Sequence, residues 1–191
     1  IIVNTNAHIG NYGISNLEQE SGTIKFSGLV CKSFSDIHSR FAADGSLQQY
    51  FEKNGIVGIS DVDTREVVRH IRSKGGMNAI VSSEILDVEQ LKNEVKLIPS
   101  MKGLELSSKV STEEAYEIGD KLAAKKVAVL DLGIKTSILS NITKKGVLCK
   151  VFPAKTTFEE MQRWNPDGYF ISNGPGDPAV TSYAIDTVKE I

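Results

Sequence analysis

The spacing of apolar residues divides the chain into an irregular first part and a regular second part. In the first part, short runs rich in β-branched and aromatic residues predict strands, and stretches with an apolar residue every three or four positions predict helices. Strands are expected at 1–5, 23–34, 56–60 and 77–83, and helices at 46–55, 63–76 and 87–98. This pattern indicates an α/β or α+β domain, in which the order of the strands stays open.

The second part, from residue 125 onward, alternates strand and helix without interruption. Strands are predicted at 125–133, 147–154 and 166–174, and helices at 134–146, 157–165 and 177–191. Such alternation is typical of an open parallel sheet with helices on both faces. Ligands of these sheets bind beyond the carboxyl ends of the strands, so the loops that follow the strands are candidate sites.

Capping residues and one polar stretch set boundaries along the chain. Ser46 has the side chain of a helix N-cap, and Gly55 suits the position that ends a helix. Residues 107–126 are polar, charged and poor in large apolar side chains, which is typical of a surface connection between domains. The expected domains are therefore 1–118 and 119–191.

Composition and charge exclude several classes of partner. Of the 191 residues, 40% are hydrophobic and 24% charged, and the formal net charge is -2. This balance gives no reason to expect nucleic acid or an anionic membrane as a partner, and no apolar run reaches the length that crosses a bilayer. Cys31 and Cys149 stand in apolar stretches without a CxxC pair, so we expect buried thiols in a reducing cytoplasm, and no zinc site.

Residues 172–178, Ser-Asn-Gly-Pro-Gly-Asp-Pro, form the most informative motif, because they lie between a predicted strand and a predicted helix. Gly174 and Gly176 bracket a proline, and glycine lets a ligand approach the main chain closely. Backbone N–H groups of such a turn, with the free amides of the next helix, can hold negative charge. The loop can therefore donate a hydrogen bond to an oxyanion in acyl transfer. The competing interpretation is a plain strand-to-helix turn.

Two acidic motifs have simpler interpretations. The turn at 131–133, Asp-Leu-Gly, lacks the GxGxxG pattern of dinucleotide sites and is read as an ordinary turn between strand and helix. The segment 61–64, Asp-Val-Asp-Thr, follows an apolar strand, as in DxDxT phosphatases with an Asp nucleophile and Mg²⁺. Its alternative is a helix start in which Asp63 or Thr64 is the cap, and we favour that alternative.

No complete catalytic pair can be assigned. The chain has no GxSxG or GxCxG turn, and covalent hydrolysis needs a nucleophile beside a base. His8, His38 and His70 do not stand at metal-binding spacings. The pattern assigns no role to the loop that contains His8, Asn11 and Tyr12.

Four segments together carry a family resemblance. They are HIGNYG at 8–13, GIVGISDVDTREVVRHIRSKGGMN at 55–78, VAVLDLGIKTSIL at 127–139 and NPDGYFISNGPGDP at 165–178. In this order and spacing they resemble the small subunit of carbamoyl-phosphate synthetase, over nearly the whole chain. SNGPGDP occurs in similar form in other class I glutamine amidotransferases, whereas the segment around DVDTR points to this family in particular.

The resemblance implies a mixed α/β N-terminal domain that docks on the large synthetase subunit, followed by the first half of a flavodoxin-like glutaminase domain with a parallel sheet. It implies hydrolysis of L-glutamine to glutamate and ammonia through a cysteinyl thioester. The large subunit would then combine ammonia with bicarbonate, using ATP, to make carbamoyl phosphate for arginine and pyrimidine synthesis. No cofactor is expected in the small subunit itself, because ATP and Mg²⁺ are used by the large subunit.

Two site residues follow from the resemblance. Gly174 resembles the glycine whose N–H forms half of the oxyanion hole, and Gly176 resembles a second glycine in contact with glutamine. The family's Cys, His and Glu are expected after Ile191, and a glutamine-binding Ser before Ile1. Because the chain opens without Met and closes inside a helical pattern, we expect an inactive piece of a longer protein. The alternative is a docking subunit that lacks the nucleophile.

Overall fold

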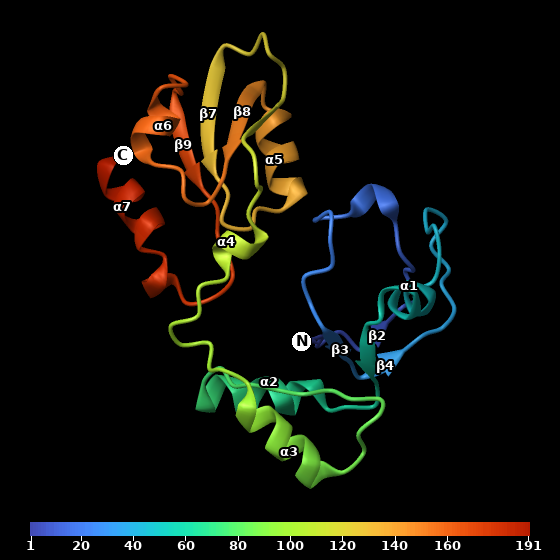
Figure 1. The fold of residues 1–191 in the computed structure, drawn as a ribbon. Coiled ribbons are helices and arrows are strands. Elements are labelled where there is room, and N and C mark those ends of the chain that lie inside the picture. The colour runs from blue at the N-terminus through green and yellow to red at the C-terminus, as the bar shows by residue number, and fades with distance from the viewer. The chain divides into compact units, whose positions relative to one another are not determined.

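The computed structural model describes residues 1–191, which divide into two compact units at 1–100 and 101–191 (Figure 1). This division comes earlier than the boundary at residue 118 that composition suggested. The polar stretch 107–126 is not a free connection, because it folds within the second unit. It contains the short helix α4 (Ser107–Val110) and the strand β6 (Tyr116–Ile118), which joins the sheet of that unit.

The first unit contains two small parallel sheets. One has the strand order β1-β3-β5, formed by β1 (Ile2–Val3), β3 (Gly28–Val30) and β5 (Val57–Ile59). The other pairs β2 (His8–Ile9) with β4 (Ser33–Phe34). A 3-10 helix, η1 (Asn16–Glu18), lies between these two strands in the sequence. The expected strand at 23–34 is therefore split into two strands that belong to different sheets.

The helices of the first unit begin at capping side chains. In α1 (Leu47–Asn54), the Ser46 hydroxyl accepts from the Gln49 N–H at 3.2 Å, and Gly55 ends the helix at φ 65°, as predicted. Both α2 (Thr64–Lys74) and α3 (Val88–Leu97) begin after an aspartate whose carboxylate accepts backbone N–H groups. All three caps supply the same missing acceptor, because the first N–H groups of a helix have no hydrogen-bond partner within it.

The strand expected at 77–83 is absent. Residues 77–83 pair with no neighbouring strand. A side chain holds the segment instead, because the Asn78 amide Nδ2 donates to the carbonyls of Ile98 and Pro99, at 2.6 and 3.1 Å. A β-branched run forms a strand only where a partner can satisfy its backbone groups.

The second unit is a four-stranded sheet of order β6-β8-β7-β9. The strands β7 (Lys125–Leu130), β8 (Val147–Phe152) and β9 (Gly168–Ile171) run parallel, as predicted, and β6 is an antiparallel edge that sequence analysis missed. The connecting helices are α5 (Thr136–Thr143), α6 (Phe158–Gln162) and α7 (Ser182–Glu190), with a 3-10 helix η2 (Pro178–Val180) before the last. No helix of either unit combines the length and the apolar character needed to cross a membrane.

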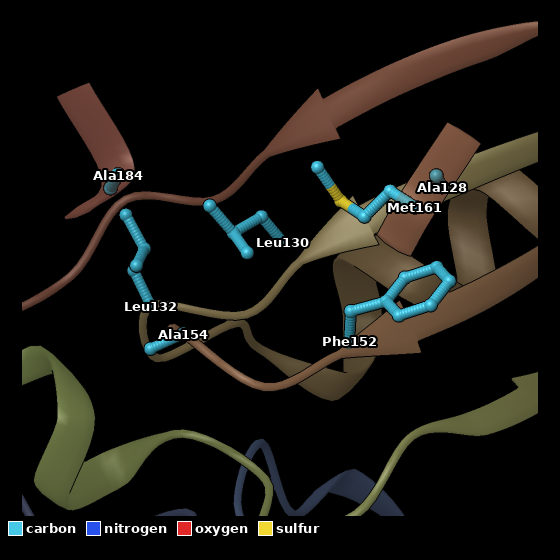
Figure 2. Close-up of a cluster of buried hydrophobic side chains, with 7 residues drawn as sticks. All are labelled: Ala128, Leu130, Leu132, Phe152, Ala154, Met161 and Ala184. Atoms are coloured by element: carbon cyan, nitrogen blue, oxygen red, sulfur yellow. The ribbon is translucent and has the colours of Figure 1, made fainter. Parts of the chain in front are cut away.

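Alternate residues of β7 point to two different cores, so helices cover both faces of the sheet. Ala128 and Leu130 pack with Met161 of α6 and Ala184 of α7 (Figure 2). Val129, on the opposite face, packs in a second cluster with Leu139 of α5. The period of two along a strand produces this division, and it confirms the expected α/β layering.

We expect Leu130→Ala to lower the free energy of unfolding by about 2–5 kcal/mol, because it removes a fully buried side chain and leaves a cavity. The matched control is Leu122→Ala, in the same unit, where the side chain is 91% exposed. Urea unfolding of both variants measures the difference. Equal losses in the two variants would contradict the position of the core.

Candidate functional site

The candidate site lies at the ends of two neighbouring parallel strands, β7 and β9. Their pairing ends with Leu130 opposite Ile171. The next residues stay in contact, because the Ser172 N–H donates to the Leu130 carbonyl at 3.1 Å and the Leu132 N–H donates to the Ser172 hydroxyl at 2.8 Å. The predicted loop 172–178 therefore lies beside the turn at 131–133, at the carboxyl edge of the sheet.

The two glycines of this loop stand where no larger residue fits. A Cβ added to Gly174 would lie 2.2 Å from the Leu132 carbonyl oxygen and 2.6 Å from the Ser107 hydroxyl. Gly176 has φ +93°, and a Cβ there would lie 2.6 Å from the Leu104 carbonyl oxygen. These approaches are below any contact that real Cβ atoms make, so the main chain of the loop requires glycine at both positions.

The loop has a backbone donor that no protein group uses. Residues 173–175 are exposed, and the Gly174 N–H donates to no acceptor of the protein. An unpaired N–H that faces solvent can bind an anionic or partly charged oxygen. The geometry is therefore suited to the hydrogen-bonding role that the sequence predicted for Gly174.

The helix expected from Asp177–Pro178 onward differs from the prediction. It begins as the 3-10 helix η2, and α7 starts only at Ser182. The Asp177 carboxylate accepts from the N–H groups of Gly103 and Ala179, at 2.9 and 3.0 Å, and these bonds lower its pKa. Because a carboxylate already occupies this helix start, its amides are not the free anion site that the sequence suggested.

The Asp131 carboxylate anchors the neighbouring turn. It is 5% exposed and accepts from the N–H groups of Gly133, Ile134 and Thr112, each at 2.8 Å. A buried carboxylate is stable when its lone pairs are satisfied in this way. The turn at 131–133 thus has a structural role, in agreement with the simpler interpretation of its sequence.

Glu105 is a second anchor that no sequence motif marks, because it lies just before a polar stretch without a recognisable pattern. Its main chain pairs with Gly176 in an antiparallel bridge. Its carboxylate accepts from the Ser108 hydroxyl at 2.5 Å, the Ser108 N–H at 2.9 Å and the Tyr183 hydroxyl at 2.7 Å. The bonds from Ser108, and then that from Tyr183, lower the pKa of Glu105 to about 2, while burial and the same contact raise the pKa of Tyr183 to about 12.

Both cysteines are buried, as predicted, with 1% exposure for Cys31 and none for Cys149. Burial raises the pKa of each thiol, and Asp61 adds to the effect at Cys31. Cys31 borders a cavity of about 250 Å³ in the first unit, lined without any histidine by Leu29, Phe34, Gln48, Phe51, Glu52, Ile56, Gly58, Ile59 and Ser60. A buried thiol whose pKa is raised is a poor nucleophile.

The remaining candidates belong to the first unit. Asp63 is the N-cap of α2 and accepts from the Glu66 N–H at 3.1 Å, which confirms the helix-start interpretation of 61–64. No group of three His, Cys, Asp or Glu side chains is arranged to hold a metal ion. His8 belongs to β2, and the nearby Asn11 has a buried Oδ1 without a hydrogen-bond partner.

Two family models match separate parts of the chain. Residues 1–81 match the family model "Carbamoyl-phosphate synthase small chain, CPSase domain", and residues 128–191, which include the glycine loop, match "Glutamine amidotransferase class-I". The chain is 41% identical over 191 residues to a carbamoyl phosphate synthase small chain of Chlorobaculum tepidum and 38% identical over 203 residues to one of Synechococcus. Each alignment covers 100% of this chain and 52% of the relative, so the chain spans about half the length of these proteins.

We expect Gly174→Ala to destabilise the second unit by about 1–3 kcal/mol, because the added methyl group must displace backbone atoms. Gly168→Ala in β9 is the control, since nothing lies within 4 Å of a Cβ there and the loss of a glycine restricts the unfolded chain. Urea unfolding compares the two. A neutral effect of Gly174→Ala would contradict the close packing of the loop.

Glu105 should make the free energy of unfolding depend on pH in the acidic range. Its pKa is lowered from 4.5 to about 2 in the folded state, so its contribution is complete above pH 4.5 and is lost as the pH falls toward 2. Glu105→Gln should therefore flatten the dependence of the unfolding free energy on pH across this range. Chemical unfolding at several acidic pH values tests this, with Glu117→Gln as a control. An unchanged slope in Glu105→Gln would refute the contribution of the carboxylate.

Proposed function

We propose that this chain, which combines a small-chain CPSase domain with a class I glutamine amidotransferase domain, belongs to the glutamine-hydrolysing subunit of a carbamoyl-phosphate synthase. The reaction is hydrolysis of L-glutamine to glutamate and ammonia. The observation that carries the proposal is the N–H of Gly174, which donates to no acceptor of the protein and belongs to an exposed loop whose close packing tolerates only glycine.

In this proposal, Gly174 donates its N–H to the oxyanion that forms when a nucleophile attacks the carboxamide carbon of glutamine. Such a donor acts mainly in the transition state, because the negative charge on oxygen develops there. Gly176 lets the loop turn at a positive φ, and in the proposal its backbone contacts the bound glutamine. In this proposal neither Cys31 nor Cys149 is the nucleophile, because both thiols are buried and burial raises the pKa of each.

The partner in this proposal is a large synthetase subunit that consumes the ammonia. That subunit uses ATP and Mg²⁺ with bicarbonate, in the cytoplasm, to form carbamoyl phosphate for arginine and pyrimidine synthesis, and the small subunit holds no cofactor of its own. The small-chain domain at 1–81 supports the pairing of subunits. The intact glycine loop favours a catalytic subunit over one that only docks.

The first test compares the 191-residue chain with the full-length protein in an assay of ammonia released from glutamine. We expect turnover by the full-length protein and none by the chain alone, because its thiols are buried. An electrophilic glutamine analogue, followed by mass spectrometry, should label a cysteine other than Cys31 and Cys149.

Cys31→Ala and Cys149→Ala, made in the full-length protein, serve as controls and should retain turnover. Loss of kcat in either variant with unchanged folding would contradict the assignment of the nucleophile. If the full-length protein releases no ammonia even with its large subunit present, the proposed hydrolysis is wrong and the protein is a docking subunit.

A further inference from the structure

The direction of the Gly174 N–H is fixed by a neighbouring carbonyl. The N–H belongs to the peptide group between Asn173 and Gly174, and no peptide bond of the chain is cis. In a planar trans peptide group, the carbonyl and the N–H point in opposite directions. Whatever holds the Asn173 carbonyl therefore also sets the direction of the Gly174 N–H.

One buried hydroxyl holds this carbonyl. The Ser172 Oγ donates to the Asn173 carbonyl oxygen at 2.9 Å. The same Oγ accepts from the Leu132 N–H at 2.8 Å. Because Leu132 directly follows the residues of β7 and Asp131, this second bond ties the hydroxyl to the rigid edge of the sheet.

The position of Ser172 excludes direct contact with a substrate. The residue is only 4% exposed, whereas residues 173–175, which follow it in the chain, are exposed. Gly174 itself packs closely against the Leu132 carbonyl oxygen and the Ser107 hydroxyl, and the latter donates to the Pro175 carbonyl at 3.1 Å. The loop is therefore held on both sides of Gly174, and the peptide between Asn173 and Gly174 is oriented by Ser172.

We propose that Ser172 is a positioning residue whose hydroxyl holds the Asn173–Gly174 peptide so that the Gly174 N–H faces solvent, ready for an oxyanion. Without the hydroxyl, the Asn173 carbonyl loses its only partner in the structure, and rotation of the peptide would turn the N–H inward. The proposal rests on the proposed glutaminase function for its effect on catalysis, but the orientation of the peptide is a structural claim that stands separately.

The test uses the full-length protein with Ser172→Ala, which removes the hydroxyl, and Ser172→Thr, which retains it. Removal of a whole oxyanion-hole donor lowers kcat by about 10²–10³-fold. Ser172→Ala, which only misdirects the donor, should lower kcat about 10–100-fold and leave KM nearly unchanged, since the lost interaction belongs to the transition state. Ser172→Thr should restore most of the rate.

The matched control is Thr187→Val, which removes another buried hydroxyl of the same unit. Thr187 is 5% exposed, and its Oγ1 donates to the Tyr183 carbonyl at 3.0 Å within α7. It should lower thermal stability as Ser172→Ala does, without the fall in kcat. This control separates a general loss of stability from a loss of orientation.

Crystal structures of the wild-type protein and of Ser172→Ala give the second readout, the direction of the Asn173–Gly174 peptide. A rotated peptide with a reduced kcat is the expected result. An unrotated peptide in Ser172→Ala overturns the proposal, whatever the rate. A rotated peptide with an unchanged kcat confirms the positioning by Ser172 and refutes the oxyanion role of Gly174, so the two proposals fail separately.

Discussion

The parallel pairing of β7 with β9 is the interaction on which the candidate site depends. It brings Leu130 opposite Ile171, so that both strands end at the same level and their loops emerge side by side. Two further bonds, through the main chain and the side chain of Ser172, continue this pairing past the strands. The glycine loop is therefore an extension of a rigid sheet, and a site on such a scaffold is held more firmly than one on a free loop.

Close backbone packing is the second constraint, and it explains why glycines stand in this loop. Gly174 lies against the turn that follows β7, while Gly176 pairs with Glu105 in the segment that precedes α4. The segment from Gly103 to Thr112 thus braces both loops, through the bonds that Asp131 and Asp177 accept from its amides. Two polar side chains of this stretch also take part, since the Ser107 hydroxyl donates to the Pro175 carbonyl and the Glu105 carboxylate accepts from the Tyr183 hydroxyl.

The sequence predicted what local patterns determine. The parallel strands of the second unit, the caps at Ser46 and Gly55, and the burial of both cysteines follow from periodicity and residue type, and the structure confirms them. Neither β6 nor the role of Glu105 could be predicted from the sequence, because their partners are distant along the chain. The false strand at 77–83 has the same cause, since strand propensity does not reveal whether a partner strand exists.

Three buried polar side chains around the loop, Ser107, Asp131 and Ser172, are each 3–5% exposed and each hydrogen-bonded to backbone groups. Net stabilisation does not account for such an arrangement, because an apolar core of the same shape can be as stable. Hydrogen bonds have direction, however, and these bonds fix how individual peptide groups point. A donor that already faces a developing charge needs no reorganisation when the charge forms. In the proposal above, Ser172 serves the orientation of the Asn173–Gly174 peptide, while Ser107 holds the Pro175 carbonyl and Asp131 holds the turn at 131–133.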